Sequence, residues 1–194
     1  IHWLEEFTAG MHDIAEYFNV QIIGGDTTKG PLTISVCAKG TVPKGKALKR
    51  SGAKNGDWIY VSGPLGDSGV AIEAQKGKHN LSPRQLEAVK KRFEYPSPRV
   101  AAGQVLRGLA SSAIDISDGL IADIQHILDL SGVGAIIDVE KVPVSDVLKE
   151  ALTQDEYLPY ALAYGDDYEL LFTVPEDNKG MLEINLRQYG VEAV

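Results

Sequence analysis

The sequence has little cysteine, no excess of basic residues and no long apolar run, and each of these excludes a class of protein. Its one cysteine, Cys37, cannot form an internal disulfide, and such low usage is typical of a reducing cytoplasm. The formal net charge of -8 argues against a nucleic-acid or anionic-membrane surface, which needs clustered lysine and arginine. No apolar run approaches the roughly 20 residues that span a bilayer. We therefore expect a cytoplasmic protein with no nucleic-acid and no membrane partner.

Three common chemical signatures are also missing. The histidines have neither metal-ligand spacing nor a nearby cysteine, which argues against a zinc site. No serine elbow or Cys–His signature supports nucleophilic hydrolysis. The glycine-rich stretch "GPLGDSG" at 63–69 is not followed by Gly-Lys-Ser/Thr, so it is not a Walker A loop and indicates a tight strand-to-helix turn.

The hydrophobic content of 44% is enough to build a core, and its periodicity predicts alternating helices and strands. Helices are expected over 3–18, 67–75, 83–93, 100–109, 119–130, 145–152, 155–162 and 176–189. Strands are expected over 20–25, 32–42, 57–63, 113–117, 134–140, 164–175 and 190–194, with Cys37 buried in the second of them. This order indicates an α/β (α+β layered) fold. Pro43 and the Gly- and Lys-rich run after it predict a boundary between residues 1–42 and 43–194. Because the chain opens inside a helical pattern without a methionine, we expect it to be a fragment.

Three acidic clusters fall at predicted strand ends or turns: "GGDTT" with Asp26, "DISDG" with Asp115 and Asp118, and "YGDDYE" with Asp166. Asp26 after two glycines is typical of a turn, and Ser117 or Asp118 is typical of a helix N-cap. A cap explains only one residue of "DISDG". The alternative is a metal–phosphate site, because carboxylates are hard ligands for Mg²⁺ and would repel phosphates unless a metal lay between them. Arg50 is the best cationic candidate beside it, although position alone favours a solvated arginine in a basic loop.

Several longer stretches, in this order, resemble the thiamine-monophosphate kinases. These stretches are "IGGDTTKGPLTISV", "LKRSGAKNGDWIYVSGPLGDS", "YPSPRV", "AIDISDGLIADI" and "GDDYELLFTVP". The kinases belong to an ATP-dependent superfamily that they share with aminoimidazole ribonucleotide synthetase. The resemblance implies the C-terminal domain of that fold over 43–194 and, over 1–42, a remnant of the N-terminal domain that binds ATP and forms a homodimer in the full-length protein.

The resemblance also implies an activity and a set of site residues. The activity is Mg²⁺-dependent transfer of a phosphoryl group from ATP to thiamine monophosphate, which gives thiamine diphosphate. The resemblance assigns the role of metal ligand to Asp26, Asp115 and Asp118. It places Gly25, Asp26, Arg50 and Ser117 at the nucleotide. Asp166 takes the place of a substrate-binding glutamate that is one methylene longer. No catalytic base is assigned, because the acceptor phosphate is already ionised at neutral pH, and the isolated chain is expected to be inactive.

Two alternatives remain open from the sequence. One is another enzyme of the same superfamily, such as aminoimidazole ribonucleotide synthetase, a hydrogenase-maturation dehydratase or selenophosphate synthetase. The other is a non-catalytic binding module in which the acidic clusters serve only as helix caps.

Overall fold

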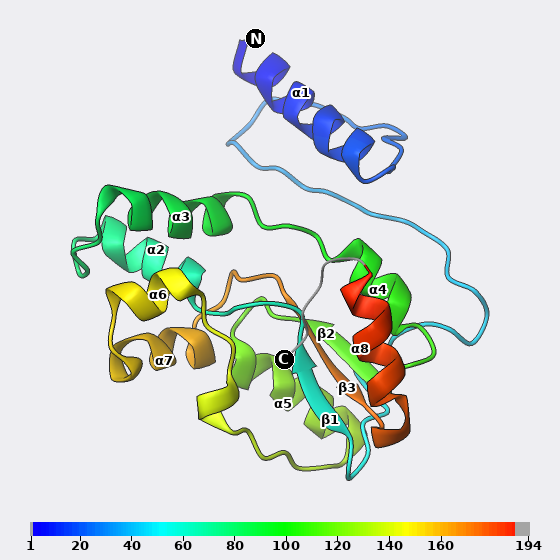
Figure 1. The fold of residues 1–194 in the computed structure, drawn as a ribbon. Coiled ribbons are helices and arrows are strands. Elements are labelled where there is room, and N and C mark those ends of the chain that lie inside the picture. Colours follow the sequence, from blue (N-terminus) through cyan, green and yellow to red (C-terminus); the bar gives the residue numbers. More distant parts are fainter. Residues whose placement is uncertain (1, 189–194) are drawn as a thin grey trace. The chain divides into compact units, whose positions relative to one another are not determined.

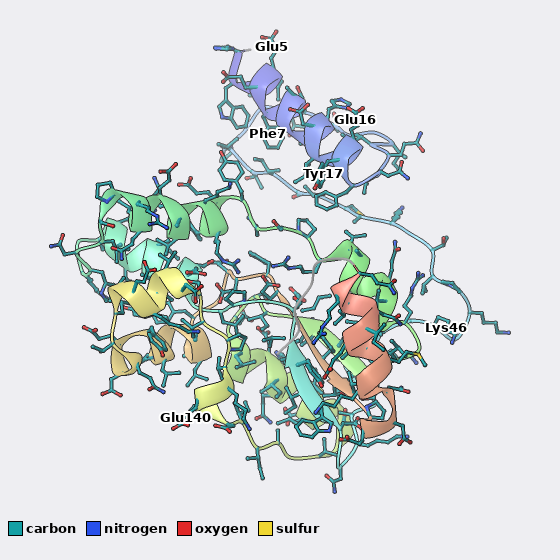
Figure 2. The ribbon with its side chains drawn as sticks, in the orientation of Figure 1. Glu5, Phe7, Glu16, Tyr17, Lys46 and Glu140 are labelled. Carbon is teal, nitrogen blue, oxygen red and sulfur yellow. The ribbon has the colours of Figure 1, made fainter. Side chains whose placement is uncertain are left out.

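The N-terminal part of the chain is one helix followed by a long coil. The computed structural model describes residues 2–188, and the chain divides into two compact units, Ile1–Thr41 and Val42–Val194. Helix α1 spans His2–Tyr17 and confirms the helix predicted from apolar spacing. The rings of Trp3 and Phe7, one turn apart, stack with centroids 5.4 Å apart. Glu5, Glu16 and Tyr17 lie along this helix in Figure 2.

The strands predicted over 20–25 and 32–42 are wrong, since both segments are coil. Cys37, predicted to be buried, is exposed. A β-branched segment becomes a strand only when its backbone N–H and C=O groups pair with a neighbouring strand. Within the part of the chain that the structure describes, no strand pairs with either segment. Their apolar side chains, such as Ile23 and Val36, are therefore left exposed.

The C-terminal unit is built on an antiparallel sheet of three strands (Figure 1). Strands β1 (Trp58–Val61) and β2 (Ser112–Asp115) flank the central strand β3 (Leu170–Val174). The register pairs Val61 with Leu171 on one side and Asp115 with Leu170 on the other. Each strand lies near its predicted position. Asp115 is the last residue of the edge strand β2.

Helices cover both faces of this sheet, which confirms the layered α+β fold. Val61, Ile114 and Leu171 face a core shared with α2, α3, α5, α6 and α7. Tyr60 and Phe172 point the other way, into a second core with α4 and α8. The helices are α2 (Asp67–Gln75), α3 (Pro83–Glu94), α4 (Val100–Leu106), α5 (Leu120–Ser131), α6 (Asp146–Ala151), α7 (Gln154–Ala163) and α8 (Lys179–Arg187).

Local capping chemistry sets several helix starts. Ser82 and Gln85 form a capping box before α3, whose first residue is Pro83. Thr153 and Glu156 form another before α7. The predicted final helix begins as a short 3₁₀ turn, η2 (Glu176–Asn178), and continues as α8.

The strand predicted over 134–140 is wrong. The chain leaves α5 through Gly132 in a left-handed conformation and continues as coil. Asp138 then accepts a hydrogen bond from the Glu140 N–H and caps the 3₁₀ turn η1 (Val139–Lys141). This local hydrogen bond competes with the backbone pairing that a strand would need. The strand predicted over 190–194 lies outside the described residues. No helix within 2–188 has the length and apolar character that crossing a membrane requires.

Candidate functional site

The predicted "DISDG" cluster lies where β2 passes into α5. Buried Ile114 and Ile116 anchor the strand end in the core, so the intervening Asp115 faces solvent. Asp118 is exposed and Ser117 is half-buried in the turn that follows. The sequence pattern thus turns both carboxylates away from the core.

The capping role considered for Ser117 or Asp118 is wrong, because the N-cap position is Gly119. The polar cap comes instead from inside the helix. The buried carboxylate of Asp123 accepts hydrogen bonds from the amides of Ser117, Asp118 and Gly119 at 3.0, 3.0 and 3.1 Å. The turn therefore donates its own amides to Asp123, and the side chains of Asp115 and Asp118 are left without a hydrogen-bond or ion-pair partner among residues 2–188.

The "YGDDYE" segment lies against the same turn and adds a third carboxylate. The Asp166 N–H donates to the Ser117 carbonyl at 3.0 Å, and the Tyr168 N–H donates to the Ile116 carbonyl at 2.9 Å. Both residues have positive φ, 64° at Asp166 and 50° at Tyr168, which is uncommon outside glycine. The Tyr168 hydroxyl then donates to Asp166 Oδ1 at 3.1 Å.

We term Asp115, Asp118 and Asp166 the acidic cluster. Its negative charge affects the pKa of Tyr168. The pKa of the Tyr168 hydroxyl is raised, first by its hydrogen bond to Asp166 and by burial, and then by the negative charges of the three aspartates. The structure therefore brings together four predicted site residues, the acidic cluster and Ser117.

The donor chemistry of the acidic cluster fits Mg²⁺, which takes one or two carboxylates and completes its shell with water and phosphate oxygens. In the described part of the chain, no three Asp, Glu, His or Cys side chains converge closely enough to hold a metal alone. Asp115 and Asp118, whose carboxylates face solvent without a full protein cage, have the arrangement expected where a ligand's phosphates supply the remaining oxygens.

The other predicted residues lie elsewhere. Arg50 is exposed and follows Lys49, whose carbonyl accepts a hydrogen bond from the Ala113 N–H at 2.8 Å, so its backbone runs beside β2. Gly25 and Asp26 belong to the N-terminal unit. Both are exposed there, and Asp26 Oδ1 accepts a hydrogen bond from the Thr27 N–H at 2.8 Å.

Sequence reasoning missed the buried ionic network next to the acidic cluster. Glu169 accepts two hydrogen bonds from Arg99, at 2.7 and 2.5 Å, and one from Arg92 at 3.2 Å. Burial raises the pKa of Glu169, but the hydrogen bonds from Arg99 and Ser62 outweigh it, and the net pKa is lowered. Arg99 stands in "YPSPRV", so the only sequence signal was its place in a stretch that resembles the kinases.

Asp167 lies close to Arg92 of this network and holds the "GPLGDSG" turn. Its carboxylate accepts the Gly66 N–H at 2.8 Å and the Ser68 N–H at 3.4 Å. Burial raises the pKa of Asp167 to about 6, although these two bonds act to lower it. The turn is therefore fixed from within by a carboxylate, as the turn after β2 is by Asp123.

A groove of about 840 Å³ runs between β1 and the coil over 133–138. None of the predicted site residues lines it. The acidic cluster and this groove are thus at different places in the C-terminal unit.

Comparison with known proteins identifies the family. The model of the AIR synthase related protein C-terminal domain matches residues 54–194, and that of the N-terminal domain matches residues 1–42. The chain belongs to the AIR synthase related proteins.

Within the AIR synthase related proteins, the chain is similar to thiamine-monophosphate kinases. It is 47% identical over 190 residues to the enzyme of Escherichia coli O157:H7, a match that covers 97% of the chain and 58% of the relative. The chain thus spans somewhat over half the length of this curated relative.

Solved structures give the same result. The crystal structure of thiamine-monophosphate kinase from Stenotrophomonas maltophilia K279a matches with a TM-score of 0.93 and 40% identity, over 99% of the chain and 62% of the solved one. AaThiL complexed with AMPPCP and TMP matches with a TM-score of 0.76 and 29% identity, over 91% of the chain and 58% of the solved one. The resemblance noted from the sequence motifs is confirmed.

Proposed function

We propose that the protein containing this chain is a thiamine-monophosphate kinase that uses ATP and Mg²⁺. The observation that carries this proposal is the 47% identity to a thiamine-monophosphate kinase over 97% of the chain. The similarity to AaThiL, solved with AMPPCP and TMP, supports both substrates.

In the proposed reaction, a phosphate oxygen of thiamine monophosphate attacks the γ-phosphorus of ATP. A new P–O bond forms, the bond from the γ-phosphorus to the β,γ-bridging oxygen breaks, and ADP leaves with that electron pair. Phosphoryl transfer depends mainly on positioning and charge stabilisation. Because the attacking phosphate is already ionised near neutral pH, we assign no side chain as a base.

The residues of this chain take the following proposed roles. Asp115 and Asp118 would hold Mg²⁺, and Asp26, in the N-terminal unit, is also assigned as a metal ligand. The ion would supply positive charge that offsets repulsion between the two phosphate groups. Gly25, Asp26, Arg50 and Ser117 contact ATP. Asp166 contacts thiamine monophosphate. The side chains of Asp115 and Asp118 have no partner among residues 2–188, which supports their proposed role as metal ligands.

We further propose a homodimer and a cytoplasmic location for the full-length protein. Residues 1–42 match the N-terminal domain model, and this is the part of the chain through which we propose dimerisation. The lone unpaired Cys37 is consistent with a reducing compartment.

The test is ADP release by the full-length protein, measured with a coupled assay in the presence of ATP and Mg²⁺. We expect release that requires thiamine monophosphate and stops when EDTA removes the metal. Aminoimidazole precursors in place of thiamine monophosphate serve as the control for the superfamily alternative. Release with those precursors, or release without any acceptor, would contradict the proposal.

A further inference from the structure

Asp123 is a buried carboxylate whose partners are all backbone amides. It lies in the first turns of α5, only 2% of its surface is exposed, and it forms no ion pair within residues 2–188. A buried charge without a cation must be compensated by hydrogen bonds. One oxygen, Oδ2, receives three of them, from Ser117, Asp118 and Gly119.

This arrangement changes what the turn offers to a ligand. Successive amides before a helix commonly bind an external phosphate, because they carry unpaired hydrogens and the positive end of the helix dipole. Here the carboxylate of Asp123 already occupies the three amides of the turn. The groups that remain outward are the carboxylates of Asp115 and Asp118. The turn therefore presents negative charge to solvent.

The turn is held on its carbonyl side as well. The carbonyls of Ile116 and Ser117 accept the amides of Tyr168 and Asp166. A Cβ on Gly165 would overlap the Ser117 carbonyl oxygen, so the two segments approach as closely as backbone permits. With Asp123 on the amide side, the backbone between Asp115 and Gly119 is fixed from both directions.

We propose that Asp123 is a positioning residue for the divalent cation. It keeps the turn in the conformation that holds Asp115 and Asp118 outward, and it makes phosphate recruitment depend on the cation instead of on the turn's amides. This inference rests on the proposed function, since Asp115 and Asp118 are its metal ligands.

The test compares Asp123→Asn with Asp129→Asn in the full-length protein. Asparagine keeps the size of the side chain and one oxygen that can accept the three amides, but it removes the negative charge that strengthens these hydrogen bonds. Asp129 is exposed on the same helix and, among residues 2–188, accepts a hydrogen bond only from Gln125, so its variant loses the same charge without touching the turn. Isothermal titration of AMPPCP at a series of Mg²⁺ concentrations gives the Mg²⁺ level at half-maximal binding, and thermal melting gives stability.

We expect Asp123→Asn to raise the half-maximal Mg²⁺ concentration by about tenfold or more, as loss of a group that orients metal ligands commonly does. Asp129→Asn should leave it unchanged. If Asp123→Asn lowers the melting temperature but shifts the Mg²⁺ requirement no more than the control does, Asp123 is only structural and the inference is overturned. If the wild type shows no Mg²⁺-dependent nucleotide binding, the proposed function itself fails.

A second measurement decides the matter where Asp123→Asn does not fold. Amide hydrogen exchange of the wild type should show Ser117, Asp118 and Gly119 protected before any Mg²⁺ or nucleotide is added, with little change afterwards. Fast exchange that becomes slow only on adding Mg²⁺ would mean that the metal, and not Asp123, orders the turn. That result would overturn the inference while leaving the proposed function intact.

Discussion

Asp115 is exposed and makes no side-chain hydrogen bond or ion pair within the described residues, so the fold gains little from its charge. Asp115→Asn should therefore shift the free energy of unfolding by no more than about 0.5 kcal/mol, as is usual for exposed positions. The same change removes a proposed Mg²⁺ ligand. We expect Mg·ATP binding to weaken by more than about tenfold, measured by calorimetric titration beside a thermal melt.

The contrary outcome for Asp115→Asn is equally clear. A large loss of stability with unchanged Mg·ATP binding would mean that the carboxylate serves the turn and not a ligand. Asp129→Asn, which removes a charge from an exposed site of the neighbouring helix, should change neither quantity.

At the scale of elements, the contact between the turn after β2 and the segment before β3 depends on Gly165. The Asp166 N–H reaches the Ser117 carbonyl only because residue 165 has no side chain. Gly165→Ala should separate the two segments and lower the free energy of unfolding by about 1–3 kcal/mol, as overpacking does. Urea denaturation measures the loss, and nucleotide titration should show weaker binding.

The chain offers a matched control for Gly165→Ala. Gly180 lies exposed in α8, and a Cβ there would meet nothing within 4 Å. Gly180→Ala should raise stability by about 0.5–1 kcal/mol, because alanine loses less backbone entropy than glycine in a helix. Equal effects of the two substitutions would show that the close approach at Gly165 is not under constraint.

The helices were predictable from the sequence because their signals are local. Apolar spacing, the Ser82 capping box and Pro83 place α3 without reference to the rest of the chain. Strands over 20–25 and 134–140 were mispredicted because strand formation depends on a partner that local sequence does not specify. The sheet itself was found because β1, β2 and β3 are short apolar runs that end in turn residues.

The candidate site was predictable only in part, for a similar reason. The crowding of Asp115 and Asp118 is visible in the sequence, but the residue that organises them is not. Asp123 reads as an ordinary acidic residue in the first turns of a helix, and only the folded backbone shows three amides converging on it. Arg99 lies 70 positions from Glu169 in the chain, so no spacing rule connects them.

At the scale of the C-terminal unit, stability depends on pH through two neighbouring buried acids that act in opposite directions. Glu169 has a lowered pKa in the folded state, so it stabilises the fold above its ordinary pKa and this contribution is lost as pH falls. Asp167 has its pKa raised from 3.8 to about 6. Between these two values the folded state binds more protons at Asp167 than the unfolded state does, so rising pH lowers stability through this group.

Asp167→Asn isolates the second effect. Asparagine keeps an oxygen that can accept the Gly66 N–H but does not titrate. The stability of the variant relative to wild type should therefore increase as pH rises from about 4 to about 6 and level off above that window. The full change should be about 3 kcal/mol, because each unit of pKa shift corresponds to about 1.4 kcal/mol. Urea denaturation across this pH range measures the difference directly. Glu169→Gln gives the opposite trend, with a stability deficit that is full above the ordinary glutamate pKa and shrinks as pH falls below it toward the lowered pKa of Glu169 in the folded state. A difference between Asp167→Asn and wild type that stays flat with pH would mean that the Asp167 carboxylate is ionised at no cost, and that the amides of Gly66 and Ser68 fully compensate its burial.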